Sequence, residues 1–333
     1  MNNMVFTSVI PRLRVLETRL LDKAKLDRMI DSKSAWEAVK VLQESEYAAH
    51  MSQVKRAEDY EEMLSAELKR VYKLMYEISP ERSVVDVMSV RYDYHNIKVL
   101  LKAKALKEDF SQLLLPIGMI EVDKLKAAVT NEEYSDLPQI MRSAIEEIER
   151  DFLATKDPQK IDIIADRYMF KHMLDIAKEI ENRFVENYVK SLIDLTNIKS
   201  LIRIKKQDKD RRFLEEVLIE GGNTDKDNFI ALLTDNLESL AGKLSYVDYI
   251  EPLRLGIEDY IKTGSLNGLE KLTDDYIVNM MKDAKYVSFG PEPVIAYIFA
   301  KENEIKLIRI IMVGKINGIE AGVIRERLRD NYV

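Results

Sequence analysis

The segment YDYHNIKVLL, at residues 92–101, decides how this chain is interpreted, because related segments occur twice more. Residues 194–202 read DLTNIKSLI and residues 303–308 read NEIKLI, so an Ile-Lys pair recurs about every hundred residues. Recurrence at a nearly fixed period is typical of one structural unit used repeatedly. The sequence therefore predicts three homologous units in a pseudo-threefold body, which favours a role in mechanics or assembly over a single catalytic cleft.

A second pair of segments supports the repeat. YMFKHMLD at residues 168–175 and YIVNMMKD at residues 276–283 share Tyr, Met and Asp at the same positions. Their offset is close to that between the second and third Ile-Lys pairs, so two matches agree on one period. Downstream of the marker, Gly118 and Gly222 each precede an aspartate by five residues. We expect three helical repeats, at residues 1–115, 116–218 and 219–333.

The composition predicts an all-α protein with a real core. Hydrophobic residues make up 46% of the 333 positions, which is ordinary for a globular protein. Charged residues reach 33%, while glycine (11) and proline (8) are scarce, and this combination favours helices. The alternation of apolar and polar residues that marks a strand is nearly absent.

Local patterns place several helix ends. Apolar residues between Leu64 and Ile78 follow steps of three and four and so predict a helix, which the Ser79-Pro80 pair ends. Ser83 is expected to cap the next helix. The absence of Pro and Gly between residues 158 and 221 predicts a long helical run from residue 161 to beyond residue 184. Residues 113–118, 207–212, 221–228, 262–268 and 288–293 are expected to be connections.

Several classes of protein are disfavoured. The net charge of −7 argues against nucleic acid as the main partner. The chain has no cysteine, which excludes disulfides and thiolate chemistry. Residues 1–20 lack the apolar centre of a signal peptide. The most apolar stretch, residues 305–313, contains Lys306 and Arg309 and is much shorter than the roughly 20 residues that a membrane span needs.

The sequence predicts no catalytic, cofactor or metal site. His95 follows Asp93 closely, but no Ser/His/Asp or Cys/His grouping accompanies it, so a helix-start or packing role is favoured. His50 and His172 are isolated, and neither a His-x-x-x-His pair nor a phosphate-binding loop occurs. We expect no small-molecule substrate. An all-α enzyme that uses His95 and Asp93 stays open as an alternative.

Two groups of basic residues are candidates for partner binding. The first marker segment predicts an amphipathic helix with a basic side, and seven basic residues lie within the fourteen positions 199–212. These residues form either a solvated helix face or a docking face for an acidic partner, where charge complementarity sets orientation and association rate. The candidates are Lys98, Lys102, Lys104, Lys199, Arg203, Lys205, Lys206, Arg211 and Arg212.

The marker segments resemble those of a known family. Residues 92–104, together with residues 12–17 and 194–203, are similar to the signature of the C subunit of the bacterial and archaeal V/A-type rotary ATPases, whose eukaryotic counterpart is the d subunit. Chain length and the triple repeat fit the family over essentially the whole chain. The third unit departs most, because Lys301 and Glu304 stand where the first two units have an Asp-x-x-Asn pattern.

The resemblance implies a funnel-shaped, non-catalytic protein of three helical parts, without cofactor. Such a protein sits on the cytoplasmic face of the membrane rotor ring (c/K ring), without spanning the membrane, and seats the central shaft of subunits D and F. It transmits torque for ATP-coupled H⁺ or Na⁺ transport, or for ATP synthesis. A generic helical scaffold that binds other proteins is the alternative.

Overall fold

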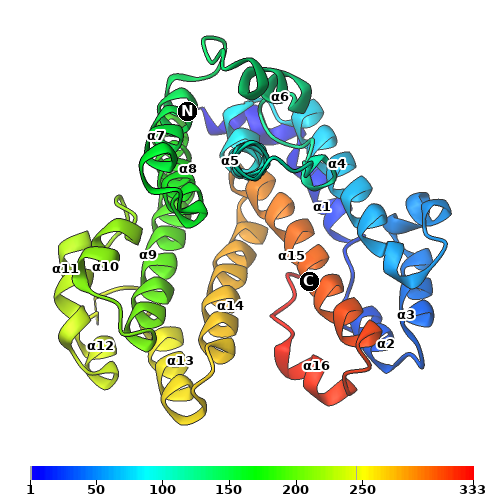
Figure 1. Cartoon of the computed structure of the whole chain (residues 1–333). Coiled ribbons are helices and arrows are strands. Elements are labelled where there is room, and N and C mark those ends of the chain that lie inside the picture. The colour runs from blue at the N-terminus through cyan, green and yellow to red at the C-terminus, as the bar shows by residue number, and fades with distance from the viewer. Residues whose placement is uncertain (1, 245) are drawn as a thin grey trace. The chain divides into compact units, whose positions relative to one another are not determined.

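The computed structural model describes residues 2–244 and 246–333, and Figure 1 shows its helices. No strand occurs among these residues, so the predicted all-α fold class is confirmed. The chain folds into two compact units. The first unit is Arg82–Asp235, and the second combines Asn2–Glu81 with Asn236–Val333. The division into three repeats and the funnel shape stay predictions.

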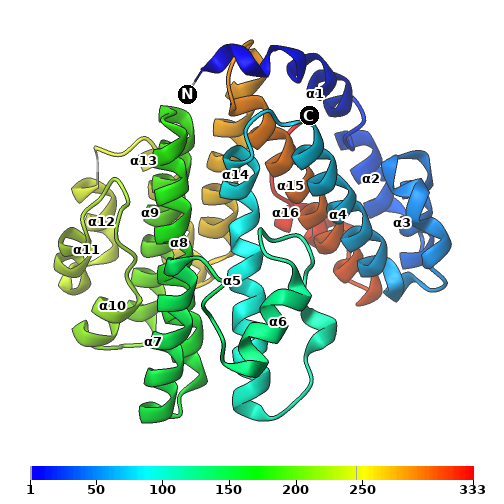
Figure 2. The same ribbon diagram turned by 90° about the horizontal axis from the view of Figure 1, so that it is seen from above.

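The first unit is built around α8, against which α5, α7 and α9 pack (Figure 2). The helix α6 packs on α5, while α10 and α11 pack on α9. The bounds are α5 Ser83–Leu106, α6 Val122–Asn131, α7 Gln139–Thr155, α8 Pro158–Ile180, α9 Arg183–Lys206, α10 Arg211–Val217 and α11 Lys226–Ala231, with short 3₁₀ helices η5 Ser111–Leu113 and η6 Leu232–Thr234.

The second unit is built around α15, which contacts α1 to α4, α14 and α16. Its α helices are α1 Ile10–Glu17, α2 Lys23–Asp31, α3 Ala35–Val41, α4 Tyr60–Ile78, α12 Leu237–Lys243, α13 Ile250–Thr263, α14 Asn267–Asp283, α15 Glu292–Ile316 and α16 Ala321–Arg327. Its 3₁₀ helices are η1 Asn3–Ser8, η2 Leu42–Glu44, η3 Glu46–Gln53, η4 Ala57–Asp59 and η7 Ala284–Tyr286. Both ends of the described chain therefore belong to one unit.

Local sequence patterns predicted some helix ends correctly and others wrongly. The helix α4 ends at Ile78, directly before Ser79-Pro80, as predicted. The predicted Ser83 cap is wrong, because Ser83 is the first helical residue and Arg82 holds the cap position without a side-chain bond. The long run after Pro158 is also wrong as one helix, because Glu181 takes a left-handed conformation (φ 55°) and separates α8 from α9.

The three marker segments lie on the three longest helices, α5, α9 and α15, which have 24, 24 and 25 residues. Each helix is buried over much of its circumference near the marker, because polar marker residues are buried as well as apolar ones. The first marker helix is thus less one-sided than the amphipathic pattern predicted. Asp93, Asn96, Asp194 and Asn197 all have 0% exposure. Buried polar groups need hydrogen-bond partners, and these residues find theirs in neighbouring loops.

Signature residues and candidate interaction surface

One asparagine in each of the first two marker segments holds a loop further along the chain. Asn96 donates from Nδ2 to the carbonyl oxygen of Leu115 and accepts the Leu115 N–H at Oδ1, both at 2.8 Å. Asn197 does the same with Ile219, at 2.7 and 2.8 Å. The side-chain amide therefore satisfies both backbone groups of one loop residue, as a neighbouring strand would.

An aspartate three residues earlier holds the next part of that loop. The carboxylate of Asp93 accepts the N–H groups of Met119 and Ile120, at 2.8 and 3.0 Å. Burial raises the pKa of Asp93 to about 7, and these two backbone bonds oppose the rise. Asp194 accepts the N–H groups of the equivalent loop residues in the same way, namely Asn223 at 2.9 Å and Thr224 at 3.2 Å.

The repeated glycine is explained by this carboxylate. A Cβ added to Gly118 would lie 2.2 Å from Oδ1 of Asp93, and one added to Gly222 would lie 2.0 Å from Oδ1 of Asp194. Both distances are far below van der Waals contact, so only glycine lets the loop approach the helix this closely. The Asp-x-x-Asn pattern and the downstream glycine form one device, which occurs twice.

The third marker segment builds a related device from different residues. Glu304 accepts the N–H of Leu21, and Asn331 donates to the carbonyl oxygen of Leu21 at 2.7 Å. Two side chains thus serve one loop residue, where the first two units use one asparagine. Lys301 takes the aspartate's place and binds Glu304 at 2.8 Å, with both side chains almost fully buried. The third marker lacks the Asp-x-x-Asn pattern. Its helix, α15, holds Leu21, which lies near the N-terminus, and not a loop further along the chain.

The structure does not bring His95 and Asp93 together as an acid–base pair. His95 lies in the middle of α5, and its Nε2 is 2.9 Å from the carbonyl oxygen of Leu113, so the predicted packing role holds and the helix-start role does not. Asp93 is occupied by loop N–H groups. Both side chains serve the loop that follows α5.

The three lysines of the first basic group form ion pairs within the first unit. Lys98 binds Asp166 and Lys102 binds Asp162, both on α8 and both at 2.7 Å. Lys104 binds Glu132 and Glu149, also at 2.7 Å. These ammonium groups join α5 to α8, to α7 and to the end of α6.

The second basic group is more exposed. Arg203 and Lys206, on the last turns of α9, are exposed, and Lys199 is half-buried. Arg211 and Arg212, on α10, pair with glutamates one turn further on, while their side chains stay 71% and 87% exposed. Lys205 differs, because its ammonium binds the carbonyl oxygens of Leu232 and Asp235 at 3.1 and 2.6 Å. The sequence did not signal this capping role.

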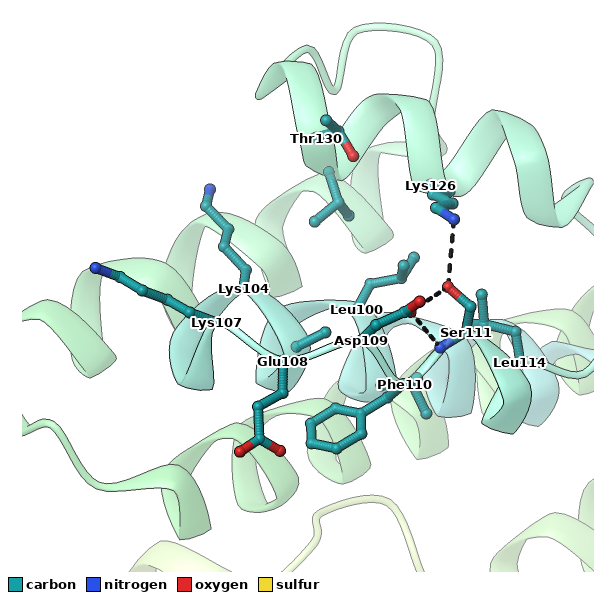
Figure 3. Close-up of a pocket in the computed structure, with 13 residues that line it drawn as sticks. Leu100, Lys104, Lys107, Glu108, Asp109, Phe110, Ser111, Leu114, Lys126 and Thr130 are labelled. Atoms are coloured by element: carbon teal, nitrogen blue, oxygen red, sulfur yellow. Dashed lines mark hydrogen bonds between the residues drawn. The ribbon is translucent and has the colours of Figure 1, made fainter.

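A cavity of about 520 Å³ opens beside the C-terminal end of α5, and Lys104 and Lys107 lie at one end of it with Lys126 at the other (Figure 3). Its polar groups bond mainly to one another. Asp109 accepts from the N–H and hydroxyl of Ser111 at 2.9 and 2.6 Å, and Lys126 donates to the same hydroxyl at 3.3 Å. These bonds join α6 to the segment that follows α5.

The described residues contain neither a candidate metal site nor a candidate membrane span. No group of three or more His, Asp or Glu side chains in residues 2–244 and 246–333 could hold a metal ion. Within the same ranges, no helix is both long enough and apolar enough to cross a membrane.

Fold and signature residues together define a class: an all-α protein whose marker helices each hold a loop through buried polar side chains. Comparison with known proteins gives the family. Residues 9–327 match the model of the ATP synthase (C/AC39) subunit family, and the chain belongs to this family. The predicted resemblance to the C subunit of the rotary ATPases is confirmed.

The relatives agree over nearly the whole chain. The C subunit of the V-type sodium ATPase of Enterococcus hirae is 28% identical, and the match covers 99% of each chain. The C subunit of the A-type ATP synthase of Methanocaldococcus jannaschii is 27% identical over 97% of this chain and 86% of its own. That of Pyrococcus abyssi is 25% identical over 96% and 88%. The chain is therefore a subunit of a V/A-type ATPase complex.

Proposed function

We propose that this protein is a non-catalytic part of the central stalk, which links the D–F shaft to the membrane rotor ring and transmits torque between them. The observation that carries the proposal is the family match over residues 9–327, together with relatives named as C subunits of a sodium ATPase and of ATP synthases. The transported ion is H⁺ or Na⁺. The protein lies on the cytoplasmic face of the ring and is held there by the assembly.

The polar devices on the marker helices support a mechanical role. An element that transmits torque has to resist deformation, and loops are normally the most deformable parts of a helical protein. In each marker segment, buried side chains bind the backbone of a neighbouring loop, so this loop is fixed to a helix of 24 or 25 residues. Close-packed helices with fixed loops form a stiff coupling.

Reconstitution tests the proposal. The shaft subunits and the ring are each mixed with this protein at low salt, and the full complex is then assembled in vesicles with and without it. We expect binding to both partners, and ATP-driven ion transport only when the protein is present, while the catalytic head alone still hydrolyses ATP. Failure to bind either partner at low salt, or full transport without the protein, would contradict the proposal.

The exposed part of the second basic group is the docking face that we propose for an acidic partner surface. Arg211 and Arg212 are the sharpest probes, because their side chains are largely exposed. The double variant Arg211→Glu/Arg212→Glu should slow association with the partner roughly tenfold at low salt and much less at high salt. Lys69→Glu/Lys73→Glu, on exposed positions of α4, is the matched control with the same change in charge.

The lysines of the first group need a different interpretation. Lys98, Lys102 and Lys104 are only 24%, 33% and 39% exposed and hold carboxylates of other helices, so a partner would have to compete for them. We propose that these three lysines contribute to docking only through the positive electrostatic potential of the surface, without direct contact with the partner. Equal loss of binding on Lys98→Gln and on Arg212→Gln, with both variants folded, would contradict this ranking of the two groups.

A further inference from the structure

A second cavity, in the other unit, lies between the C-terminal half of α15 and α16. It has a volume of about 420 Å³. Its apolar wall comes mainly from Ile310, Ile319 and Ile324, and three arginines stand around it. Neither the marker segments nor the proposed docking face accounts for it.

Close backbone packing forms this cavity. The chain turns back after α15 through Gly318, in the left-handed conformation (φ 66°), and the Ile319 N–H bonds to the Gly314 carbonyl oxygen at 2.8 Å. A Cβ on Gly314 would lie 2.6 Å from the side chain of Ile324, which is 1% exposed. Arg325 ties α16 to Asp31 of α2 at 2.6 Å. The apolar wall of the cavity is therefore preformed by contacts within the chain.

The charged side chains that line the cavity are all positive. Arg309, Arg327 and Arg329 line it, and no carboxylate side chain does. Arg309 makes a two-point pair with Glu61, and Arg329, whose side chain is only 13% exposed, binds Asp274 at 3.0 Å. Arg327 is exposed and has no ion-pair partner among the described residues. Since Arg309 and Arg329 are paired, Arg327 supplies the unpaired positive charge beside this apolar surface.

Two further features increase the positive potential. The bonds of Arg329 to Asp274 and to the Arg327 carbonyl oxygen use Nε and Nη1, so neither uses Nη2. Asn267, the first residue of α14, also lines the cavity, and the preceding cap residue makes no side-chain bond to the helix. The N-terminal end of a helix carries partial positive charge. A guanidinium offers paired N–H groups that match the two oxygens of a carboxylate.

We propose that this cavity docks a short acidic peptide segment, in which a Glu or Asp side chain binds Arg327 and Arg329 and a neighbouring apolar side chain fills the isoleucine pocket. The half-exposed Val313, at 48%, extends the apolar surface at the opening. The proposal goes beyond the stalk function, since it depends only on the chemistry of the cavity. If the chain works in a rotary complex, the segment belongs to a neighbouring subunit.

The surroundings favour a peptide over an anionic membrane surface. Glu320 and Glu326 flank the cavity along the chain, and Asp274 lies behind Arg329. These charges, with the net charge of −7, repel an extended negative surface, whereas a short segment reaches the arginines within the screening distance of about 8–10 Å. A phosphate ion would match the arginines and leave the isoleucine wall unused.

The test uses the full chain and a defined pair of probes. The peptide acetyl-Glu-Leu-Leu-Glu-amide and its Gln-Leu-Leu-Gln counterpart are titrated while methyl NMR signals of isoleucine are followed. We expect the glutamate peptide to shift the signals of Ile310, Ile319 and Ile324, and to bind at least tenfold more tightly than the glutamine peptide. Arg327→Gln should weaken binding at least fivefold, whereas Arg150→Gln, at an exposed arginine on α7 of the other unit, should leave it unchanged.

Three outcomes would overturn the proposal: equal affinity for both peptides, shifts located elsewhere, or Arg327→Gln without effect. Inorganic phosphate and vesicles of phosphatidylglycerol with phosphatidylcholine are run in parallel, and Arg327-dependent binding of either one without peptide binding would identify a different occupant. Val313→Glu is a second variant, which places a carboxylate at the opening and should also abolish binding. Reconstitution of the complex is a separate measurement, so failure here is distinct from failure of the stalk function.

Discussion

At the scale of single residues, the loop after α5 depends on a close contact between Gly118 and the side chain of Asp93. Gly118 has room for a hydrogen atom but not for a methyl group, because the carboxylate of Asp93 occupies that place. That carboxylate cannot withdraw without leaving two loop N–H groups unpaired. Unpaired buried donors cost about 1–3 kcal/mol each.

Gly118→Ala should therefore destabilise the protein by about 1–3 kcal/mol, the usual cost of overpacking. The measurement is the free energy of unfolding in urea, followed by circular dichroism. Gly322→Ala is the matched control, since nothing lies within 4 Å of the added Cβ in α16. There the helix preference for alanine should leave stability equal or raise it by up to about 1 kcal/mol. Equal stability of the two variants would show that the close approach is unimportant.

His172 makes the free energy of unfolding depend on pH. Burial lowers the pKa of His172 to about 4, and its Nδ1 lies 3.4 Å from the hydroxyl of Tyr94. In the unfolded chain the pKa is near 6.5, so the unfolded state binds more protons between these values. The associated stability is complete above pH 6.5 and is lost as pH falls toward 4, by about 3 kcal/mol in all.

His172→Gln removes this titration. Unfolding free energies of both proteins, measured from pH 7.5 to pH 4, should converge or cross as pH falls, because only the wild type has a histidine here whose protonation favours the unfolded state. Other groups titrate in the same range, including Asp93, but they are common to both proteins. Parallel curves would contradict the assignment of a neutral, buried imidazole.

At the scale of elements, both ends of α9 are made without proline or glycine. The break between α8 and α9 consists of Glu181 in the left-handed conformation, followed by Asn182, which caps α9 by accepting the N–H groups of Phe184 and Val185. A similar left-handed residue, Asp208 (φ 51°), follows α9. Left-handed backbone costs about 1 kcal/mol for residues other than glycine.

Glu181→Gly should raise stability by about 0.5–1 kcal/mol, because glycine adopts this conformation without strain. Asn182→Ala should lower stability by about 1 kcal/mol through loss of the cap. Thermal unfolding measures both. Lys171→Gly, at an exposed position inside α8, is the control and should cost about 1 kcal/mol, as glycine does in a helix interior. A loss in Glu181→Gly comparable to that control would mean that the left-handed turn is not what separates the helices.

At the scale of the whole molecule, the two ends of the chain complete the second unit. Tyr332 donates its hydroxyl to Glu17 at 2.9 Å, and Asn331 binds the carbonyl oxygen of Leu21. Glu304 of α15 holds the N–H of the same leucine. The third marker segment thus depends on residues from both terminal regions.

Deletion of residues 328–333 should therefore loosen the second unit and leave the first unit intact. We expect hydrogen exchange of backbone amides to accelerate at least tenfold in α1 and in the central turns of α15, with α5 and α8 unchanged. Deletion of Val333 alone, which is 42% exposed, is the control. Uniform acceleration in both units would contradict the assignment of these contacts to the second unit.

Much of this arrangement could be predicted from local sequence. The recurring Ile-Lys pair marked segments that lie on α5, α9 and α15, and the Ser79-Pro80 pair gave the end of α4, because proline acts on its immediate neighbour. The resemblance built on the marker gave the family. The nine basic candidates were found by their density, but density could not distinguish lysines paired across α5 and α8 from exposed arginines on α10.

Sequence by itself determined the all-α class, since helical periodicity is a property of residues three and four apart. Tertiary structure alone decided what the marker residues do. Asp93 and Asn96 became loop anchors, and Glu304 met Leu21, because packing brings together groups that are far apart along the chain. A buried polar side chain must find a partner, and which partner it finds depends on the backbone that folding places beside it.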